Sequence, residues 1–214
     1  MVNEEQRESL KKTLFVKIII EPYNPDWTKV FGRLKADLLQ HIGFVQPRID
    51  HIGSTSVQGL SAKPIIDILI GLEGEQDLDI IIQPLIKAGY IYYEVYNLYM
   101  PYRRFFVKHQ LAPLHLSLPV HIRQETEIPD PETEHHHRLA HIHAIPVGSG
   151  HWHRHIAFRD YLQNHPEVLQ AYQLLKKSLS VFDWKDGNEY NEAKNDFIKR
   201  EEQKAVDWYI KRGS

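Results

Sequence analysis

The sequence contains no cysteine, which excludes disulfide bridges, thiolate catalysis and cysteine-based zinc sites in this 214-residue chain. It also lacks any apolar stretch close to the roughly 20 residues that a membrane-spanning helix needs. Neither sign of charge dominates, because 26 lysines and arginines stand against 28 aspartates and glutamates, for a formal net charge of −2. This balance argues against bulk electrostatic binding to nucleic acid or to an anionic membrane.

What the sequence does contain is typical of a soluble globular protein, with 42% hydrophobic and 25% charged residues. The first residues, MVNEEQRESLKK, are polar and lack the apolar region of a signal peptide. We therefore expect a cytoplasmic protein with one domain over 1–214 and a polar arm over 1–12. The sequence leaves open whether the chain forms an oligomer with itself. The 14 histidines are its one unusual count.

The spacing of apolar residues predicts an α+β fold. A first helix is expected after Asn24-Pro25 and before Gly43, because apolar residues recur there at helical spacing. Strands are predicted over 13–20, 48–53, 64–70, 90–95, 103–108 and 139–145, and further helices over 77–89, 151–164, 166–179 and 189–210. Since strands come first and helices last, we expect a mixed sheet with helices packed on it. The irregular, histidine-rich residues 109–138 are interpreted as an insertion or long hairpin.

A short hydroxyl-rich segment, beginning at Gly53, follows the second predicted strand. Glycine lets a ligand approach the backbone, and the free N–H groups of a helix start attract phosphate. Ser54 and Thr55 add hydroxyl donors, and Lys63 adds a positive charge nearby. We therefore predict that Gly53, Ser54, Thr55 and Lys63 bind a phosphate group. The alternative is an ordinary strand-to-helix cap.

Asp67 stands within the strongly apolar run Pro64–Ile70, whose pattern suits a central strand covered on both faces. A lone carboxylate is costly to bury there unless it is paired or binds a metal. We therefore predict Asp67 as the catalytic residue. The alternative is a structural pairing with Arg48, Lys63 or a tyrosine hydroxyl.

Two histidines at alternate positions of a predicted strand, His141 and His143, point to the same face. If that strand neighbours the strand of Asp67, the three side chains are predicted to bind a divalent metal ion, with His51 as a fourth member of the cluster. The alternative is a pair of ordinary hydrogen-bonded histidines. Arg103 and Arg104 face opposite ways on another strand, and Arg104 is assigned to the ligand, with a structural ion pair as its alternative.

Several segments in order along the chain resemble the GrpB family. They cover most of residues 16–200 and read Tyr23-Asn-Pro-Asp-Trp27, His51-Ile-Gly-Ser-Thr-Ser-Val57, Gly59-Leu-Ser-Ala-Lys-Pro-Ile-Ile-Asp-Ile68, Arg103-Arg-Phe-Phe106, His141-Ile-His143, His155-Ile-Ala-Phe-Arg-Asp-Tyr-Leu162, His165-Pro166 and Tyr190-Asn-Glu-Ala-Lys194. The resemblance implies a nucleotidyltransferase-like mixed sheet with an N-terminal helix and a C-terminal helical portion. In that superfold a Gly-Ser turn holds a triphosphate and strand carboxylates hold two divalent metals. Gly53 and Ser54 match the turn, and Asp67 matches the first carboxylate.

The chain departs from that pattern where the second carboxylate is expected, because Leu69 stands there. The later strand offers His141 and His143 in place of a third carboxylate. One aspartate with imidazoles suits a single transition-type ion better than two Mg²⁺ ions, so the expected cofactor is one divalent metal ion: Mg, Mn or Zn.

The leading hypothesis is a protein that binds a nucleotide or phosphorylated small molecule, with metal-dependent phosphoryl or nucleotidyl transfer as its chemistry. The alternatives are a non-catalytic nucleotide-binding module, a His/Asp metal-dependent hydrolase, and an interaction protein that uses the aromatic stretch 90–102.

Overall fold

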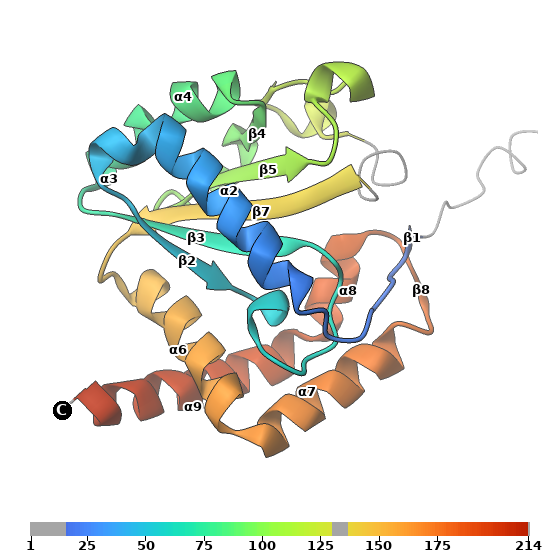
Figure 1. The fold of residues 1–214 in the computed structure, drawn as a ribbon. Helices are drawn as coiled ribbons and strands as arrows, with labels where there is room; N and C mark the ends of the chain where they lie inside the picture. Colours follow the sequence, from blue (N-terminus) through green and yellow to red (C-terminus); the bar gives the residue numbers. More distant parts are fainter. Residues whose placement is uncertain (1–15, 130–136, 214) are drawn as a thin grey trace, which may run out of the picture.

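A computed structural model describes residues 16–129 and 137–213, so the predicted arm over 1–12 lies outside the described residues. Its centre is a six-stranded mixed sheet in the order β2-β3-β7-β5-β4-β6 (Figure 1). A separate two-stranded sheet pairs β1 with β8. The α+β expectation is confirmed. The strands are β1 (Val16–Lys17), β2 (Arg48–Ile52), β3 (Ile66–Leu72), β4 (Tyr90–Tyr93), β5 (Arg104–His109), β6 (His121–Ile122), β7 (Arg138–Pro146) and β8 (Asp183–Trp184).

The pleat of the central strands gives the sheet two different faces. β3 and β7 are parallel neighbours, with β2 antiparallel to β3 and β5 antiparallel to β7. Ile68 and Ile70 point to one face and belong to the same buried cluster as Leu38 of the first helix. Asp67 and Leu69 alternate with them and point to the other face. Asp67 therefore avoids the main core.

The helices divide between these two faces. α2, α3 and α4 contribute to the core on the face of Ile68, and α2 runs across the sheet in Figure 1. The C-terminal helices lie on the other side, where α6 packs on β2, β3 and β7. Within the described ranges no helix has the length and apolar character that crossing a bilayer takes. The helices are α2 (Asp26–Ile42), α3 (Glu75–Ile80), α4 (Ile82–Lys87), α6 (Gly150–Asn164), α7 (Pro166–Leu179), α8 (Gly187–Ala193) and α9 (Asn195–Gly213).

Two predicted helices are each divided in the structure. The helix expected over 77–89 is α3 followed by α4, with Ile81 between them. Pro84 lacks the N–H that would bond the carbonyl four residues earlier, so a continuous helix cannot close there. The helix expected over 189–210 is α8 followed by α9, and Lys194 lies at the break. That break matters below, because it places the Lys194 side chain in a cavity.

The stretch interpreted as an insertion or long hairpin contributes to the main sheet in its described part. Two-residue strand β6 pairs in parallel with β4 at the sheet edge, so it is not one arm of a simple hairpin. Short 3₁₀ turns, η4 (Pro113–Leu116) and η5 (Glu125–Glu127), flank β6.

The aromatic stretch 90–102, considered above as a partner surface, begins inside the core. Tyr90, Tyr92 and Tyr93 are buried, whereas Leu98 and Tyr99 are exposed. These three buried rings therefore belong to the core and are not part of a partner surface.

Candidate functional site

The turn after β2 brings the hydroxyl-rich segment against Asp67. Ile52 pairs with Asp67 in the sheet register, so the next residue, Gly53, lies beside the carboxylate. Gly53 has a φ of +69°, which favours glycine, and the 3₁₀ turn η2 (Ser54–Ser56) begins directly after it. A Cβ atom on Gly53 would lie 2.8 Å from the Asp67 Cβ and closer still to its Oδ2 atom. A glycine is thus required for the turn and the aspartate to meet.

Asp67 is the end of a hydrogen-bonded series that crosses from β3 to β7. The register pairs Asp67 with His141, and the His141 Nδ1 atom lies 3.2 Å from Asp67 Oδ1. Arg138 Nη1 lies 3.3 Å from His141 Nε2. Because a guanidinium can only donate, Nε2 accepts and Nδ1 carries the proton that is donated to Asp67. Burial lowers the pKa of His141, against the opposing effect of the Asp67 hydrogen bond.

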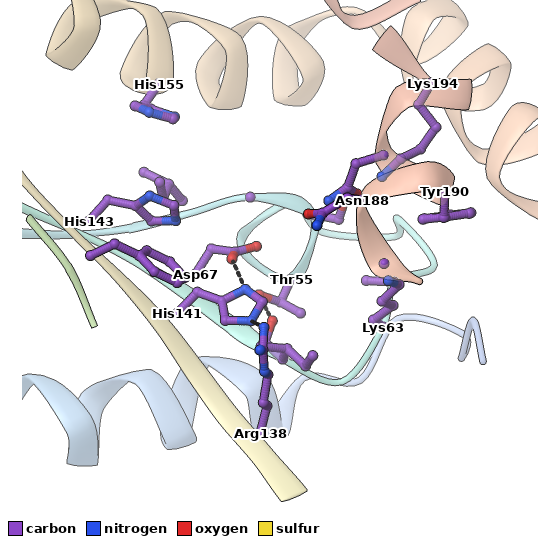
Figure 2. A pocket seen from close by; sticks show the side chains of 18 of the residues that line it. Thr55, Lys63, Asp67, Arg138, His141, His143, His155, Asn188, Tyr190 and Lys194 are labelled. Carbon is purple, nitrogen blue, oxygen red and sulfur yellow. Dashed lines mark hydrogen bonds and ion pairs between the residues drawn. The ribbon is translucent and has the colours of Figure 1, made fainter. Parts of the chain in front are cut away.

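Asp67 faces a cavity of about 820 Å³ that lies on the sheet face opposite α2. Figure 2 shows Asp67 and His141 between two groups of side chains, with His143 and His155 on one side and Lys63 and Lys194 on the other. The walls come from the β2 turn, strands β3 and β7, helices α6 and α7, and the segment around α8. Such a volume fits a small organic ligand.

Three lysines from distant segments converge at one end of this cavity, and we call them the lysine cluster: Lys63, Lys176 and Lys194. The Lys176 ammonium donates to Ser54 Oγ at 3.1 Å and also to the Ser61 carbonyl. The Tyr190 ring lies between the other two, with its centroid 4.6 Å from Lys63 Nζ and 4.3 Å from Lys194 Nζ. This arrangement concentrates positive charge next to the Gly53 turn.

The charged forms of the three lysines in the cluster are unfavourable, because burial removes them from water and brings their charges close together. Burial and the neighbouring Lys194 lower the pKa of both Lys63 and Lys176 to about 7, and burial lowers that of Lys194 to about 8. The Asp67 carboxylate has the opposite effect, since its negative charge raises the pKa of all three lysines. In the described part of the chain no ion pair joins these ammonium groups to a carboxylate. An anionic ligand would supply the missing counter-charge.

The other end of the cavity carries neutral histidines and an arginine. Arg103 Nη1 lies 3.1 Å from His143 Nδ1, so that nitrogen accepts a hydrogen bond. The rings of His143 and His155 are 5.7 Å apart. Burial, reinforced by neighbouring arginines, lowers the pKa of His143 well below its usual value and that of His155 to about 3. Both rings are therefore neutral at physiological pH.

The predicted metal ligands lie together, but their arrangement does not fit a metal centre. His141 Nε2 and His143 Nδ1 each accept from an arginine, and His141 Nδ1 donates to Asp67. Across residues 16–129 and 137–213 no group of three or more histidine, aspartate or glutamate side chains is placed to hold a metal ion. The surrounding charge is positive, which favours an anion over a cation.

The other predicted site residues divide between the cavity and the opposite sheet face. Gly53, Ser54, Thr55 and Lys63 line the cavity, although the Thr55 side chain is buried and its hydroxyl lies 3.0 Å from His51 Nε2. His51 itself stacks on Phe31 of α2 and is not part of the Asp67 cluster.

The prediction that Arg104 contacts the ligand does not hold for this arrangement. Arg104 pairs with Ala144 in the register and therefore shares the α2 face, where its Nε atom donates to Asp79 at 2.6 Å. Of these two arginines, Arg103, immediately before β5, is the one that lines the cavity. The sequence established that the two face opposite ways, but the choice between them depended on the β5–β7 register.

Sequence reasoning gave no role to Lys176 or Lys194. Lys176 carried a usable signal in the sequence, since it lies four residues after Tyr172 on the apolar side of a helix. In the structure its side chain is 2% exposed. A lysine at such a position is seldom buried without a partner. Lys194 ends the segment Tyr190-Asn-Glu-Ala-Lys194 that contributes to the family resemblance, but its spacing assigned it no role, because the α8–α9 break that directs it inward was not expected.

Comparison with known proteins gives consistent results over most of the chain. The family model described as GrpB protein matches residues 17–204. The glutamate-rich protein GrpB of Alkalihalophilus pseudofirmus is 29% identical over 183 residues, which cover 85% of this chain and 92% of that protein. The UPF0157 protein YqkA of Bacillus subtilis is 29% identical over 192 residues, or 90% of this chain, which spans about half (48%) of that longer relative.

Among solved structures, the crystal structure of conserved protein GrpB from Enterococcus faecalis superposes with a TM-score of 0.68 at 28% identity. The match covers 90% of this chain and 99% of that one.

Proposed function

The chain belongs to the GrpB family, and we propose that its cavity binds the phosphate of a nucleotide or of another phosphorylated small molecule. The observation that carries this proposal is the lysine cluster. Lys176 and Lys194 are buried, Lys176 donates to the Ser54 hydroxyl, and within the described residues no member of the cluster has a carboxylate partner. Charges buried in this way are unfavourable until an opposite charge joins them.

Each part of the turn has a distinct place in such a complex. Ser54 and the backbone after Gly53 would donate hydrogen bonds to phosphate oxygens, while the lysine cluster would neutralise them. Asp67 lies beside the turn as an acceptor for a hydroxyl group of the ligand. The cavity of about 820 Å³ leaves room for more than a free phosphate ion.

The first experiment is calorimetric titration of the protein with a nucleoside triphosphate and with inorganic phosphate. Replacing Lys176 by methionine should weaken phosphate binding by about 10- to 100-fold, since a charged hydrogen bond contributes about 1.5–3 kcal/mol. The matched control is Lys177→Met, one residue along α7 with an exposed side chain. Equal affinities in the two variants would reject the lysine cluster as the phosphate site.

Asp67→Asn separates binding without a metal from the metal-dependent binding that the sequence predicts. Without a metal, loss of the carboxylate removes repulsion of the phosphate, and affinity should rise by about threefold or more. If Asp67 instead holds Mg²⁺, Mn²⁺ or Zn²⁺, the same change should abolish metal-dependent ligand binding while the fold stays intact. Titrations with each ion and with a chelator distinguish these results, and an unchanged affinity in both settings would remove Asp67 from the site.

The second candidate function is a nucleotide-binding module without catalysis, and Leu69 is the observation that favours it. Leu69 is fully buried and packs with Ile52 and Trp152, so the position of the expected second carboxylate belongs to the core. Phosphoryl or nucleotidyl transfer by two metals needs several anionic oxygens. Tight nucleotide binding with no release of phosphate or pyrophosphate would support this module, and turnover that Asp67→Asn abolishes would support the transferase.

A further inference from the structure

The end of the cavity away from the lysine cluster contains another cation, and within residues 16–129 and 137–213 it has no carboxylate partner. Arg103 lines the cavity and, among the described residues, its guanidinium makes one hydrogen bond, to His143 Nδ1. Its remaining contact of note is with the Phe105 ring, whose centroid is 5.0 Å from Cζ. By contrast, Arg159 on another wall is neutralised, since it contacts Asp160 at 2.7 Å and Asp50 at 3.5 Å. Arg103 therefore retains donors and charge for a ligand.

Two neutral imidazoles accompany this guanidinium. His143 accepts from Arg103 through Nδ1, so its Nε2 carries a proton and is a donor. His155 comes from α6 and makes ring contact with His143 but no hydrogen bond within the described residues. Neutral imidazoles beside a guanidinium leave one fixed positive charge and additional N–H donors. A guanidinium with additional N–H donors beside it is suited to bind a carboxylate or a phosphate.

The two cationic groups lie on opposite sides of Asp67. His143 is two residues beyond His141 on β7, so their Cα atoms are separated by roughly 7 Å. Figure 2 shows His143 and His155 on one side of Asp67, and Lys63 and Lys194 on the other. The Asp67 carboxylate therefore lies between the two groups.

We propose that Arg103, His143 and His155 form a second anion subsite, so that the ligand carries two anionic groups on either side of a neutral portion. This inference rests on the proposed function for its first group, the phosphate at Ser54 and the lysine cluster. The neutral portion passes Asp67, which accepts a hydrogen bond from it. The substrate class is thus a phosphorylated small molecule with a second phosphate or a carboxylate, not a monophosphate.

Crystals soaked in sodium tungstate, a heavy phosphate mimic, test the two subsites separately. We expect one anomalous peak at Ser54 and Lys176 and another at Arg103 and His155. The Arg103 peak should disappear in Arg103→Gln and persist in Lys176→Met. A peak at the lysine cluster alone would overturn the second subsite and leave the proposed function standing. A peak at Arg103 alone would overturn the phosphate site at the lysine cluster and, with it, the ligand with two anionic groups. No peak at either place would overturn both subsites.

Calorimetry in solution tests whether one molecule uses both subsites. A nucleoside 3′,5′-bisphosphate should bind at least about tenfold more tightly than the matching 5′-monophosphate, and Arg103→Gln should remove that advantage. The control is Arg104→Gln, whose side chain is on the opposite sheet face and bonded to Asp79. Equal affinities for the two nucleotides in the unaltered protein would refute the inference. So would an advantage that survives in Arg103→Gln.

Discussion

Replacing Gly53 by alanine tests the contact on which the whole site depends. Gly53 has φ +69° and ψ −174°, a combination that is essentially confined to glycine. The alanine Cβ would also lie 2.8 Å from the Cβ of Asp67 and 2.9 Å from its Cγ. Neither of these Asp67 atoms is the far end of a flexible chain, so the turn or β3 must shift.

The magnitude follows from these two contributions. Forcing a side chain into such a backbone conformation costs about 1–3 kcal/mol. Overpacking against a fixed neighbour costs about 1–3 kcal/mol more. We therefore expect Gly53→Ala to lower the free energy of unfolding by about 2–6 kcal/mol, and to weaken phosphate binding because Ser54 is displaced.

Urea denaturation is the appropriate assay, and Gly59→Ala is the matched control. Gly59 also has a positive φ, +82°, but nothing lies within 4 Å of its added Cβ. Gly59→Ala should therefore lower the free energy of unfolding by the backbone contribution alone, about 1–2 kcal/mol. If Gly53→Ala is no more destabilising than Gly59→Ala, Asp67 does not approach the turn as described, and the turn and the carboxylate do not form one site.

Two further predictions concern the surroundings of Asp67. Leu69→Asp introduces the expected second carboxylate, and it should destabilise the protein by about 3 kcal/mol or more, because Leu69 is fully buried. Urea denaturation measures the stability and calorimetry measures metal binding. A stable variant with new metal affinity would contradict this prediction. The lysine cluster should make the free energy of unfolding rise between about pH 7 and pH 10. In that window the unfolded lysines, with an ordinary pKa of 10.5, bind more protons than the folded ones. Urea curves at pH 7, 8 and 9 measure the rise, Lys176→Met should reduce it, and a falling curve in the unaltered protein would refute the lowered lysine pKa values.

The periodicity of the sequence was sufficient for the main secondary structure and for part of the site. α7 (Pro166–Leu179) spans the predicted residues, and β7 extends the predicted strand 139–145 by one residue at each end. Asp67, His141 and His143 were expected on one face, and the strands that carry them are neighbours. These features follow from the two-residue repeat of a strand and the 3.6-residue repeat of a helix, which depend only on local chain geometry.

The hydrogen-bond partners of the site residues were much harder to predict from the sequence than the sheet face on which each side chain lies. The histidines predicted to bind a metal accept hydrogen bonds from Arg103 and Arg138. Nothing in the spacing of His141 and His143 indicates those arginines, because one of them comes from a different strand region. Pro84 predicts a bend or a delayed start in the helix expected over 77–89, but the sequence does not place the break at Ile81.

By itself the sequence determined the α+β class, the apolar strand that carries Asp67, and the glycine turn before it. Only the tertiary structure decided that Arg103 and not Arg104 faces the cavity, because strand register selects the face. It alone also brought Lys176 to Ser54, 122 residues away in the chain. A local pattern specifies which side of an element is apolar, whereas the meeting of distant charges depends on how whole elements pack.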